Sequence, residues 1–326
     1  MKPDTTICRL KDDKACAVTF TTDDALYRSC VFYQSRFKEY GLKGTLVFST
    51  HFISPPPKNM PECNDFASWE QWQAFLSEGH FDVANHTKSH PYLNQITPEQ
   101  LEDEINGAQE VLREKFPGQK VLCFASPYVV TDEASEAVIR QRHFSARNGG
   151  GGFNSLNPTE HEWYWLKLQA ALHDSTAEGM NAWVDQAIEG NLWLIEMWHG
   201  VDGQWWEPPA AEECDKHLLY LSGKLGTVWN GTMEEVTLYI RERQHASVVT
   251  EYKNETELHV FLETDLDSSL FDYPLTLRTE VPPDWNAARL ICGNQDQTLA
   301  VREMDGHQVV YYDAVPNTGT LILRKA

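Results

Sequence analysis

Apolar and polar positions follow one pattern over the first 243 residues and another over the rest. In the first part, apolar runs with the length of buried strands lie at residues 15–20, 44–49, 81–84, 121–125 and 192–198. Helix-like segments lie between some of these runs, at residues 26–40, 66–78 and 97–116. Strands that alternate with helices predict βαβ units around a parallel sheet or barrel.

The helix expected over residues 97–116 has the clearest boundary signals. Thr97 is placed to cap its first turn, Pro98 takes the first helical position, and Gln100 completes a capping box. Pro117-Gly118 ends the segment, and the apolar residues within it recur at helical spacing.

Beyond Arg243, short strand candidates follow one another with turn signals such as Asp305-Gly306 between them and no helical stretch. They lie at residues 257–262, 274–281, 288–292, 299–303, 309–313 and 321–324. This spacing predicts an all-β, sandwich-like fold. We therefore expect an α/β chain of two domains: a distorted (β/α) barrel over residues 1–243 and a smaller β accessory domain over residues 244–326.

The net charge of the chain limits the classes of partner that it can bind. The 326 residues include 27 Lys and Arg against 48 Asp and Glu, a formal charge of −21. Nucleic acids and anionic membranes require a basic surface, so we expect neither as a partner. No stretch approaches the roughly 20 apolar residues of a membrane span. The N-terminus has no apolar leader, which fits either a cytoplasmic protein or a mature form of an exported one.

Several polar clusters directly follow apolar strands. In a β/α barrel, the carboxyl ends of all strands open on one face, where active sites are built. These clusters should therefore converge on one pocket. They are Thr21-Thr22-Asp23-Asp24, Asn85-His86-Thr87-Lys88-Ser89-His90, Ser126-Pro127-Tyr128 and His199-Gly200.

The residue types in these clusters suit hydrolysis at a divalent metal. His86 and His90 are four residues apart, so one tight turn can direct both imidazoles to a single point. A carboxylate from Asp23 or Asp24 would complete a His₂-carboxylate site with a position open for water. The other carboxylate could take a proton from that water, and His199 could protonate a leaving group.

The ordered clusters resemble the motifs of NodB-like polysaccharide deacetylases, carbohydrate esterase family four. The resemblance covers roughly residues 15–240. His86-Thr87-Lys88-Ser89-His90 matches the family's H-[ST]-x-x-H motif at every position, while Thr22 replaces the Phe of its T-F-D-D motif. The remaining matches are Ser126-Pro127-Tyr128 and Met197-Trp198-His199.

The resemblance implies a mononuclear metal and a role for each matched residue. Asp24, His86 and His90 become the metal ligands, which would hold Zn²⁺ or, equally by ligand type, Co²⁺, Ni²⁺ or Mn²⁺. Asp23 becomes the general base, His199 the general acid, and the Tyr128 backbone N–H an oxyanion donor. Metal-bound water would then attack an acetyl group on a poly- or oligosaccharide.

The sequence departs from the family pattern in its third motif. The family places an Arg two positions before the motif's Pro, paired with the catalytic Asp, where this chain has Ala125. The Gly that often follows the aromatic residue is Val129. Arg147, which also follows a strand-like run, is our candidate for the missing partner of Asp23. The family's fourth motif has no clear match in this sequence. Asp174 is its nearest match by chain order, but we do not include Asp174 among the site residues.

Tryptophans near the last motif favour a glycan partner, because aromatic faces stack on sugar rings. We expect Trp205, Trp206 and Trp198 to contact substrate, with the first two in a loop after His199. Two other functions stay open: hydrolysis of a cyclic amide or imide on the same barrel, as in allantoinases, and glycan binding without catalysis. A homodimer also remains open.

Overall fold

The computed structural model describes residues 4–55, 65–293 and 295–326, so Cys63 lies outside the described residues. The described chain divides into two units. The barrel unit comprises Ala15–Thr237, and the β unit comprises the residues up to Lys14 together with Leu238–Ala326. The division differs from the expected boundary, because the first 14 residues belong to the β unit and not to the barrel.

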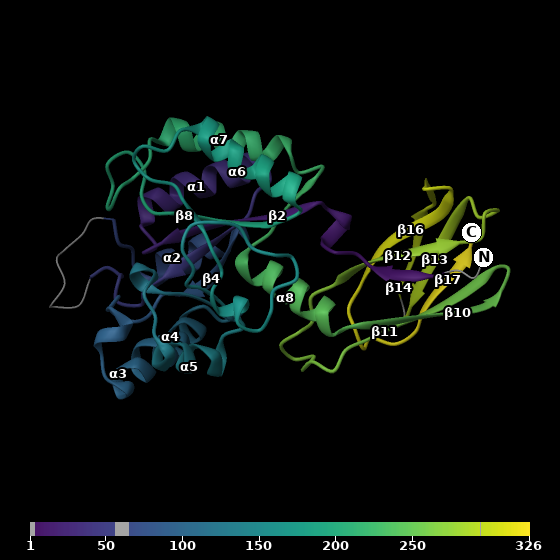
Figure 1. The fold of residues 1–326 in the computed structure, drawn as a ribbon, viewed down its shortest axis with the longest axis horizontal. Helices are drawn as coiled ribbons and strands as arrows, with labels where there is room; N and C mark the ends of the chain where they lie inside the picture. Colours follow the sequence, from purple (N-terminus) through teal and green to yellow (C-terminus); the bar gives the residue numbers. More distant parts are fainter. Residues whose placement is uncertain (1–3, 56–64, 294) are drawn as a thin grey trace. The chain divides into compact units, whose positions relative to one another are not determined.

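The barrel unit is built on a parallel sheet whose strands run in the order β6-β5-β4-β3-β2-β8-β7, with β9 paired to β2 (Figure 1). Its strands are β2 (Cys16–Asp23), β3 (Gly44–Phe48), β4 (Phe81–Asn85), β5 (Cys123–Ala125), β6 (Ser145–Arg147), β7 (Gln169–Ala170), β8 (Trp193–Trp198) and β9 (Val228–Asn230). Every described pairing between these strands is parallel, which confirms the predicted α/β fold.

Irregular pairing brings the two ends of this sheet together. Beyond β6, Gly149 donates a backbone hydrogen bond to Leu166, and Leu166 donates to Ala146 within β6. An isolated parallel bridge joins Gly151 to Leu168, directly before β7. These isolated contacts stand in place of a regular pairing between β6 and β7. The barrel is therefore distorted, as the sequence predicted.

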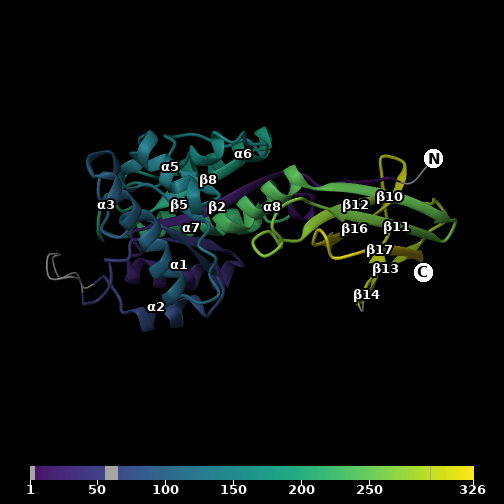
Figure 2. The same ribbon diagram turned by 90° about the horizontal axis from the view of Figure 1, so that it is seen from below.

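Helices cover the outside of this sheet (Figures 1 and 2). They are α1 (Tyr27–Tyr40), α2 (Trp69–Leu76), α3 (Pro98–Glu102), α4 (Ala108–Lys115), α5 (Glu133–Arg142), α6 (Ala177–Gly190), α7 (Ala211–Gly223) and α8 (Met233–His245), which extends into the β unit. The predicted helix 97–116 appears as α3 and α4 joined by a π-helical turn, Asp103–Gly107. Thr97 and Gln100 form the expected capping box.

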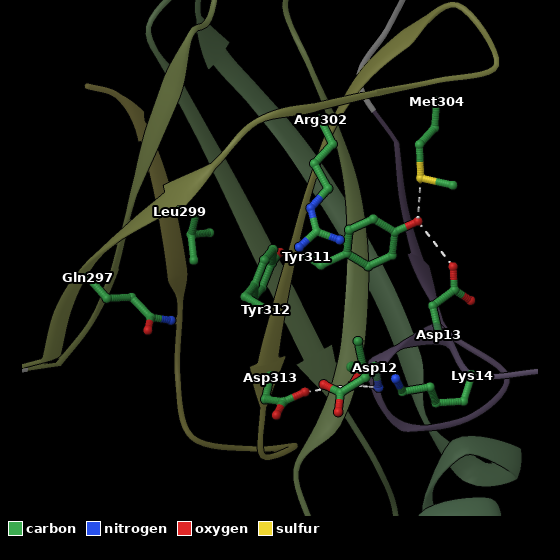
Figure 3. A pocket seen from close by; sticks show the side chains of 11 residues that line it. Asp12, Asp13, Lys14, Gln297, Leu299, Arg302, Met304, Tyr311, Tyr312 and Asp313 are labelled. Atoms are coloured by element: carbon green, nitrogen blue, oxygen red, sulfur yellow. Dashed lines mark hydrogen bonds between the residues drawn. The ribbon is translucent and has the colours of Figure 1, made fainter. Parts of the chain in front are cut away.

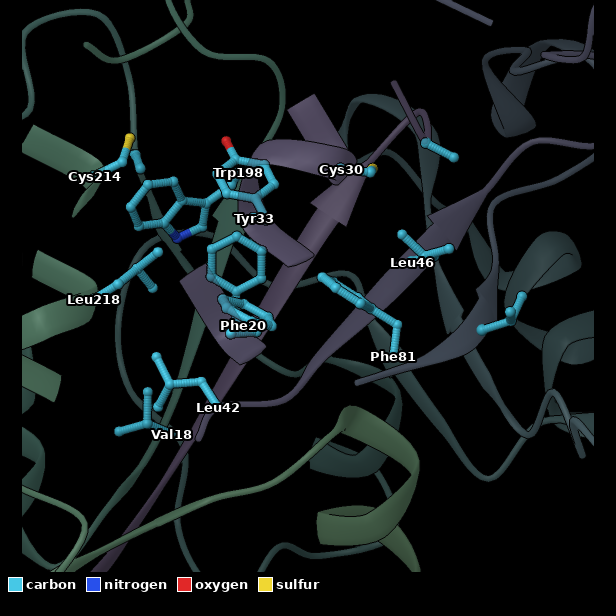
Figure 4. Close-up of a cluster of buried hydrophobic side chains, with 14 of the residues drawn as sticks. Val18, Phe20, Cys30, Tyr33, Leu42, Leu46, Phe81, Trp198, Cys214 and Leu218 are labelled. Carbon is cyan, nitrogen blue, oxygen red and sulfur yellow. The ribbon is translucent and has the colours of Figure 1, made fainter. Parts of the chain in front are cut away.

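A buried aromatic cluster holds α1 against β2 and β8 (Figure 4). The Phe20 ring lies 4.9 Å from Tyr33, 4.9 Å from Phe37 and 5.0 Å from Trp198, measured between ring centroids. Aromatic pairs at such distances add about 0.5–1.5 kcal/mol each beyond the area they bury. This packing fixes the strand that carries the two aspartates beside the strand that leads to His199.

The β unit consists of two antiparallel sheets, with strand orders β1-β12-β16-β15 and β10-β11-β17-β13-β14 (Figure 2). Its strands are β1 (Thr5–Ile7), β10 (Ser247–Asn254), β11 (Glu257–Glu263), β12 (Leu275–Val281), β13 (Ala287–Cys292), β14 (Gln295–Ala300), β15 (Arg302–Met304), β16 (His307–Ala314) and β17 (Leu321–Lys325). The predicted C-terminal β domain is therefore present, extended by the N-terminal strand.

A polar cavity of about 780 Å³ opens in the β unit, where β16 and the edge strands β14 and β15 meet the loop around Asp13 (Figure 3). Its side chains largely engage one another. Tyr311 donates a hydrogen bond to Asp13, and the Arg302 guanidinium lies over the Tyr311 ring.

Within the described residues, no helix is both long and apolar enough to span a bilayer.

Candidate active site

The polar clusters predicted from the sequence meet at the carboxyl ends of the barrel strands. Asp23 is the last residue of β2, and Asp24 follows it. His86 follows β4, and His199 follows β8. Together with Tyr128 these residues line one cavity of about 520 Å³. Parallel strands bring their carboxyl ends to one edge, which is why segments distant in sequence converge here.

Asp24, His86 and His90 form a group with the geometry of a metal site. One ligand atom from each residue lies within 4.8 Å of the others. Asp24 Oδ1 is 3.7 Å from His86 Nε2 and 3.5 Å from His90 Nε2. That oxygen is buried and has no hydrogen-bond partner among the described residues. A buried carboxylate oxygen without a partner is costly, and a cation between the three atoms would remove the cost.

The two imidazoles are prepared to act as ligands. His86 Nδ1 lies 2.7 Å from the Ala125 carbonyl oxygen, so it is the protonated nitrogen and Nε2 offers its lone pair. Burial lowers the pKa of His86 to about 3 and also lowers that of His90, which keeps both rings neutral. Burial raises the pKa of Asp24 to about 6. Two neutral imidazoles and one carboxylate are a donor set that Zn²⁺ and similar ions accept.

Asp23 forms a buried ion pair with Arg147. Arg147 Nη2 donates hydrogen bonds of 2.7 and 2.5 Å to the two carboxylate oxygens. Burial alone would raise the pKa of Asp23, but the Arg147 charge, the nearby His86 and His199, and the Arg147 hydrogen bond together outweigh burial and lower it. Asp23 is therefore a carboxylate held in its ionised form within the cavity.

The position of Arg147 explains how the chain tolerates Ala125. In the parallel pairing of β5 with β6, Ala125 lies directly beside Arg147 in register. The guanidinium thus reaches Asp23 from the neighbouring strand instead of from the third motif. This placement agrees with the pairing that the sequence suggested for Arg147.

Three exposed aromatic side chains surround the cavity mouth. Tyr92 and Tyr128 stack with ring centroids 4.0 Å apart, and Trp206 packs edge-on against His199 at 5.2 Å. All three line the cavity, and their exposed fractions are 44%, 51% and 54%. No sequence pattern pointed to Tyr92, although it lies only two residues beyond His90, where the histidine motif ends.

The other two tryptophans expected to contact substrate differ from each other in exposure. Trp198 is fully buried, and its indole N–H donates to the buried Glu196 at 3.0 Å. It has no surface to offer a sugar, so its expected substrate contact is wrong: Trp198 is a core residue. Trp205 is partly exposed, and its indole N–H donates to Asp24 Oδ2 at 2.7 Å. Asp174 is exposed and is not among the residues that line the cavity.

Left-handed backbone conformations are concentrated at this site. The φ angles are +64° at Asp24, +60° at His90, +58° at Tyr128 and +67° at Trp205. Each such conformation costs an L-residue about 1–2 kcal/mol, so surrounding contacts must impose it. The strained residues are therefore two proposed metal ligands, the cavity residue Tyr128 and Trp205, which hydrogen-bonds to one of those ligands.

Comparison with known proteins places these features in context. Residues 11–146 match the sequence model of a family described as polysaccharide deacetylase, a segment that contains Asp23, Asp24, His86, His90 and Tyr128. A gellan lyase from a Bacillus species is 21% identical over 333 residues, covering 95% of this chain and 13% of the lyase. The chain therefore spans a small fraction of that relative's length.

Two solved structures of family 4 carbohydrate esterases are similar to this chain at low sequence identity. A family 4 carbohydrate esterase from Streptomyces lividans, in complex with acetate, is 16% identical with a TM-score of 0.42, covering 67% of this chain and 93% of that one. A family 4 acetyl xylan esterase from Clostridium thermocellum, in complex with cobalt, is 16% identical with a TM-score of 0.46, covering 68% and 89%.

Proposed function

We propose that the chain is a metal-dependent hydrolase that removes acetyl groups from an acetylated saccharide, since residues 11–146 match the polysaccharide deacetylase model. The observation that supports this most strongly is the buried Asp24 Oδ1, which has no hydrogen-bond partner in the described part of the chain and faces the Nε2 atoms of His86 and His90. These three residues would hold a divalent cation, for which we favour Zn²⁺. When bound, the ion supplies a Lewis acid that polarises the acetyl carbonyl and acidifies water.

Asp23 and His199 are placed for proton transfer. The lowered pKa of Asp23 keeps it ionised, so it can accept a proton from the attacking water as general base. Arg147 is a positioning residue, because it fixes the Asp23 carboxylate through both oxygens. His199 lines the same cavity, from where it can donate a proton to the departing amine or alcohol. The Tyr128 backbone N–H would stabilise the oxyanion.

The cavity mouth suits a sugar chain. Saccharide rings expose C–H faces that stack on aromatic side chains, and Tyr92, Tyr128 and Trp206 present such surfaces. The cavity volume of about 520 Å³ accommodates a group the size of a sugar residue. Ala125 in place of the family Arg is the feature that favours cyclic-amide hydrolysis. Since Arg147 pairs with Asp23, that reason no longer applies.

Acetate release tests this proposal. The metal-loaded protein should release acetate from an O-acetylated xylan oligomer or from an N-acetylglucosamine oligomer, and the active class identifies the bond. Asp23→Asn should bind metal but lose turnover, whereas His86→Ala combined with His90→Ala should lose both. If the metal-loaded wild type releases no acetate from either class but opens a cyclic amide or binds glycan without turnover, the proposal is wrong.

A further inference from the structure

We propose that Trp205 is a positioning residue of the metal site, whose indole N–H holds the Asp24 carboxylate so that one oxygen alone faces the cation. This inference rests on the metal site proposed above. The substrate contact that the sequence suggested for Trp205 stays a separate prediction.

The two carboxylate oxygens of Asp24 have different neighbours. Trp205 Nε1 donates to Oδ2 at 2.7 Å, while Oδ1 is directed at His86 and His90 and has no other partner among the described residues. A hydrogen bond to one oxygen fixes the rotation of the carboxylate and favours cation binding through the other oxygen. Groups that orient metal ligands in this way commonly change metal affinity 10- to 100-fold when they are removed.

The Trp205 ring is held by the same aromatic residues that support His90. It packs edge-on against Phe52 at 6.0 Å and against Phe66 at 5.8 Å. Phe52 in turn stacks on His90, with ring centroids 5.8 Å apart. One aromatic cluster therefore lies behind two of the three ligands, and a displaced indole would disturb Asp24 directly.

The loop that carries Trp205 is anchored independently of substrate. Gly200 closes a turn in which a Cβ atom would come within 1.9 Å of the Gln204 carbonyl oxygen. Ser29 of α1 donates to the Gln204 side chain at 2.8 Å and accepts from the Val201 backbone at 3.2 Å. The Trp205 backbone then adopts φ +67°, which directs the indole at Asp24. This loop begins immediately after His199, so the proton donor and the ligand support belong to one segment.

Zinc affinity measured by competition with a chromogenic chelator tests the inference. Trp205→Phe keeps an aromatic ring but removes the N–H, and we expect it to weaken zinc binding 10- to 100-fold. Trp206→Phe is the matched control, because Trp206 neighbours it in the same loop and contacts His199 instead of Asp24. Its zinc affinity should stay within about threefold of the wild type.

A second replacement distinguishes loss of the N–H group from a change in packing or folding. Benzothienylalanine at position 205 has nearly the shape of tryptophan with sulfur in place of the N–H, and it should weaken zinc binding as Trp205→Phe does. If the wild type binds zinc and both replacements bind it equally well, the inference is wrong while the proposed metal site stands. If Trp206→Phe weakens binding as much as Trp205→Phe, the loop acts generally and the inference is also wrong. A wild type that binds no zinc would instead contradict the proposed function.

Discussion

Replacing Arg147 tests the electrostatic design of the site. Arg147→Met keeps much of the side-chain volume but leaves the Asp23 carboxylate buried without its partner. Removing one member of a buried ion pair typically costs about 3–5 kcal/mol. Without the Arg147 charge, burial acts on Asp23 with less opposition, so the pKa of its carboxyl should rise. The general base would then be protonated over much of the range in which the wild type is active.

The assay is the pH dependence of kcat/KM at constant metal saturation. The acid limb should move to higher pH in Arg147→Met, because the Asp23 pKa rises when the Arg147 charge is lost, and Arg147→Lys should restore part of the shift. An unmoved acid limb would refute the reasoning, even if the rate fell.

Stability gives an independent check with a defined sign. The folded-state pKa of Asp23 is lowered, so its contribution to stability is present above the unfolded-state pKa and is lost as pH falls. Arg147→Met should therefore be destabilised by about 3–5 kcal/mol at pH 7 and much less near pH 3. Asp23→Asn in the same background should restore stability without restoring activity. A loss that is equal at both pH values would mean that packing, not charge, explains the defect.

Three further predictions concern other parts of the barrel. Val129 is β-branched at φ +55°, so Val129→Gly should be neutral or stabilising by up to about 1 kcal/mol in thermal unfolding, whereas Val130→Gly should destabilise. Trp198→Ala should lower the free energy of unfolding by about 3–5 kcal/mol, while Trp206→Ala should mainly raise KM; a reversed pattern would restore the substrate role of Trp198. Burial raises the pKa of Glu234 from 4.5 to about 8, so ionisation of this residue destabilises the fold increasingly as pH rises between these values. Glu234→Gln should melt higher than the wild type at pH 8 but not at pH 4.5, and an equal difference at both would contradict this.

The sequence predicted correctly which polar residues lie at the ends of the barrel strands. Asp23, Asp24, His86 and His199 each lie at or just beyond the last residue of a buried strand, so apolar runs alone located them. Arg147 was found for the same reason, as the last residue of β6. Register between neighbouring parallel strands then made its pairing with Asp23 geometrically accessible.

Contacts across long sequence separations could not be predicted in this way. Trp198 ends a strand that is buried on both faces, so no alternation showed whether its ring faced the core or the cavity. Trp205 donates to a residue 181 positions away, and no local pattern encodes that hydrogen bond. The N-terminal strand β1 pairs with β12, more than 270 residues further along the chain, which is why the sequence assigned it to the barrel. Tyr92 is a single aromatic residue in a polar loop, without periodicity to distinguish it.

Metal stoichiometry tests the central claim most directly, because it requires no guess at the substrate. Elemental analysis after equilibrium dialysis against Zn²⁺ should give one metal ion per chain for the wild type. The variant that combines His86→Ala with His90→Ala should retain none, since two of the three ligand atoms are lost. A wild type that remains metal-free with Zn²⁺, Co²⁺ or Ni²⁺, or a double variant that keeps its metal, would contradict the account.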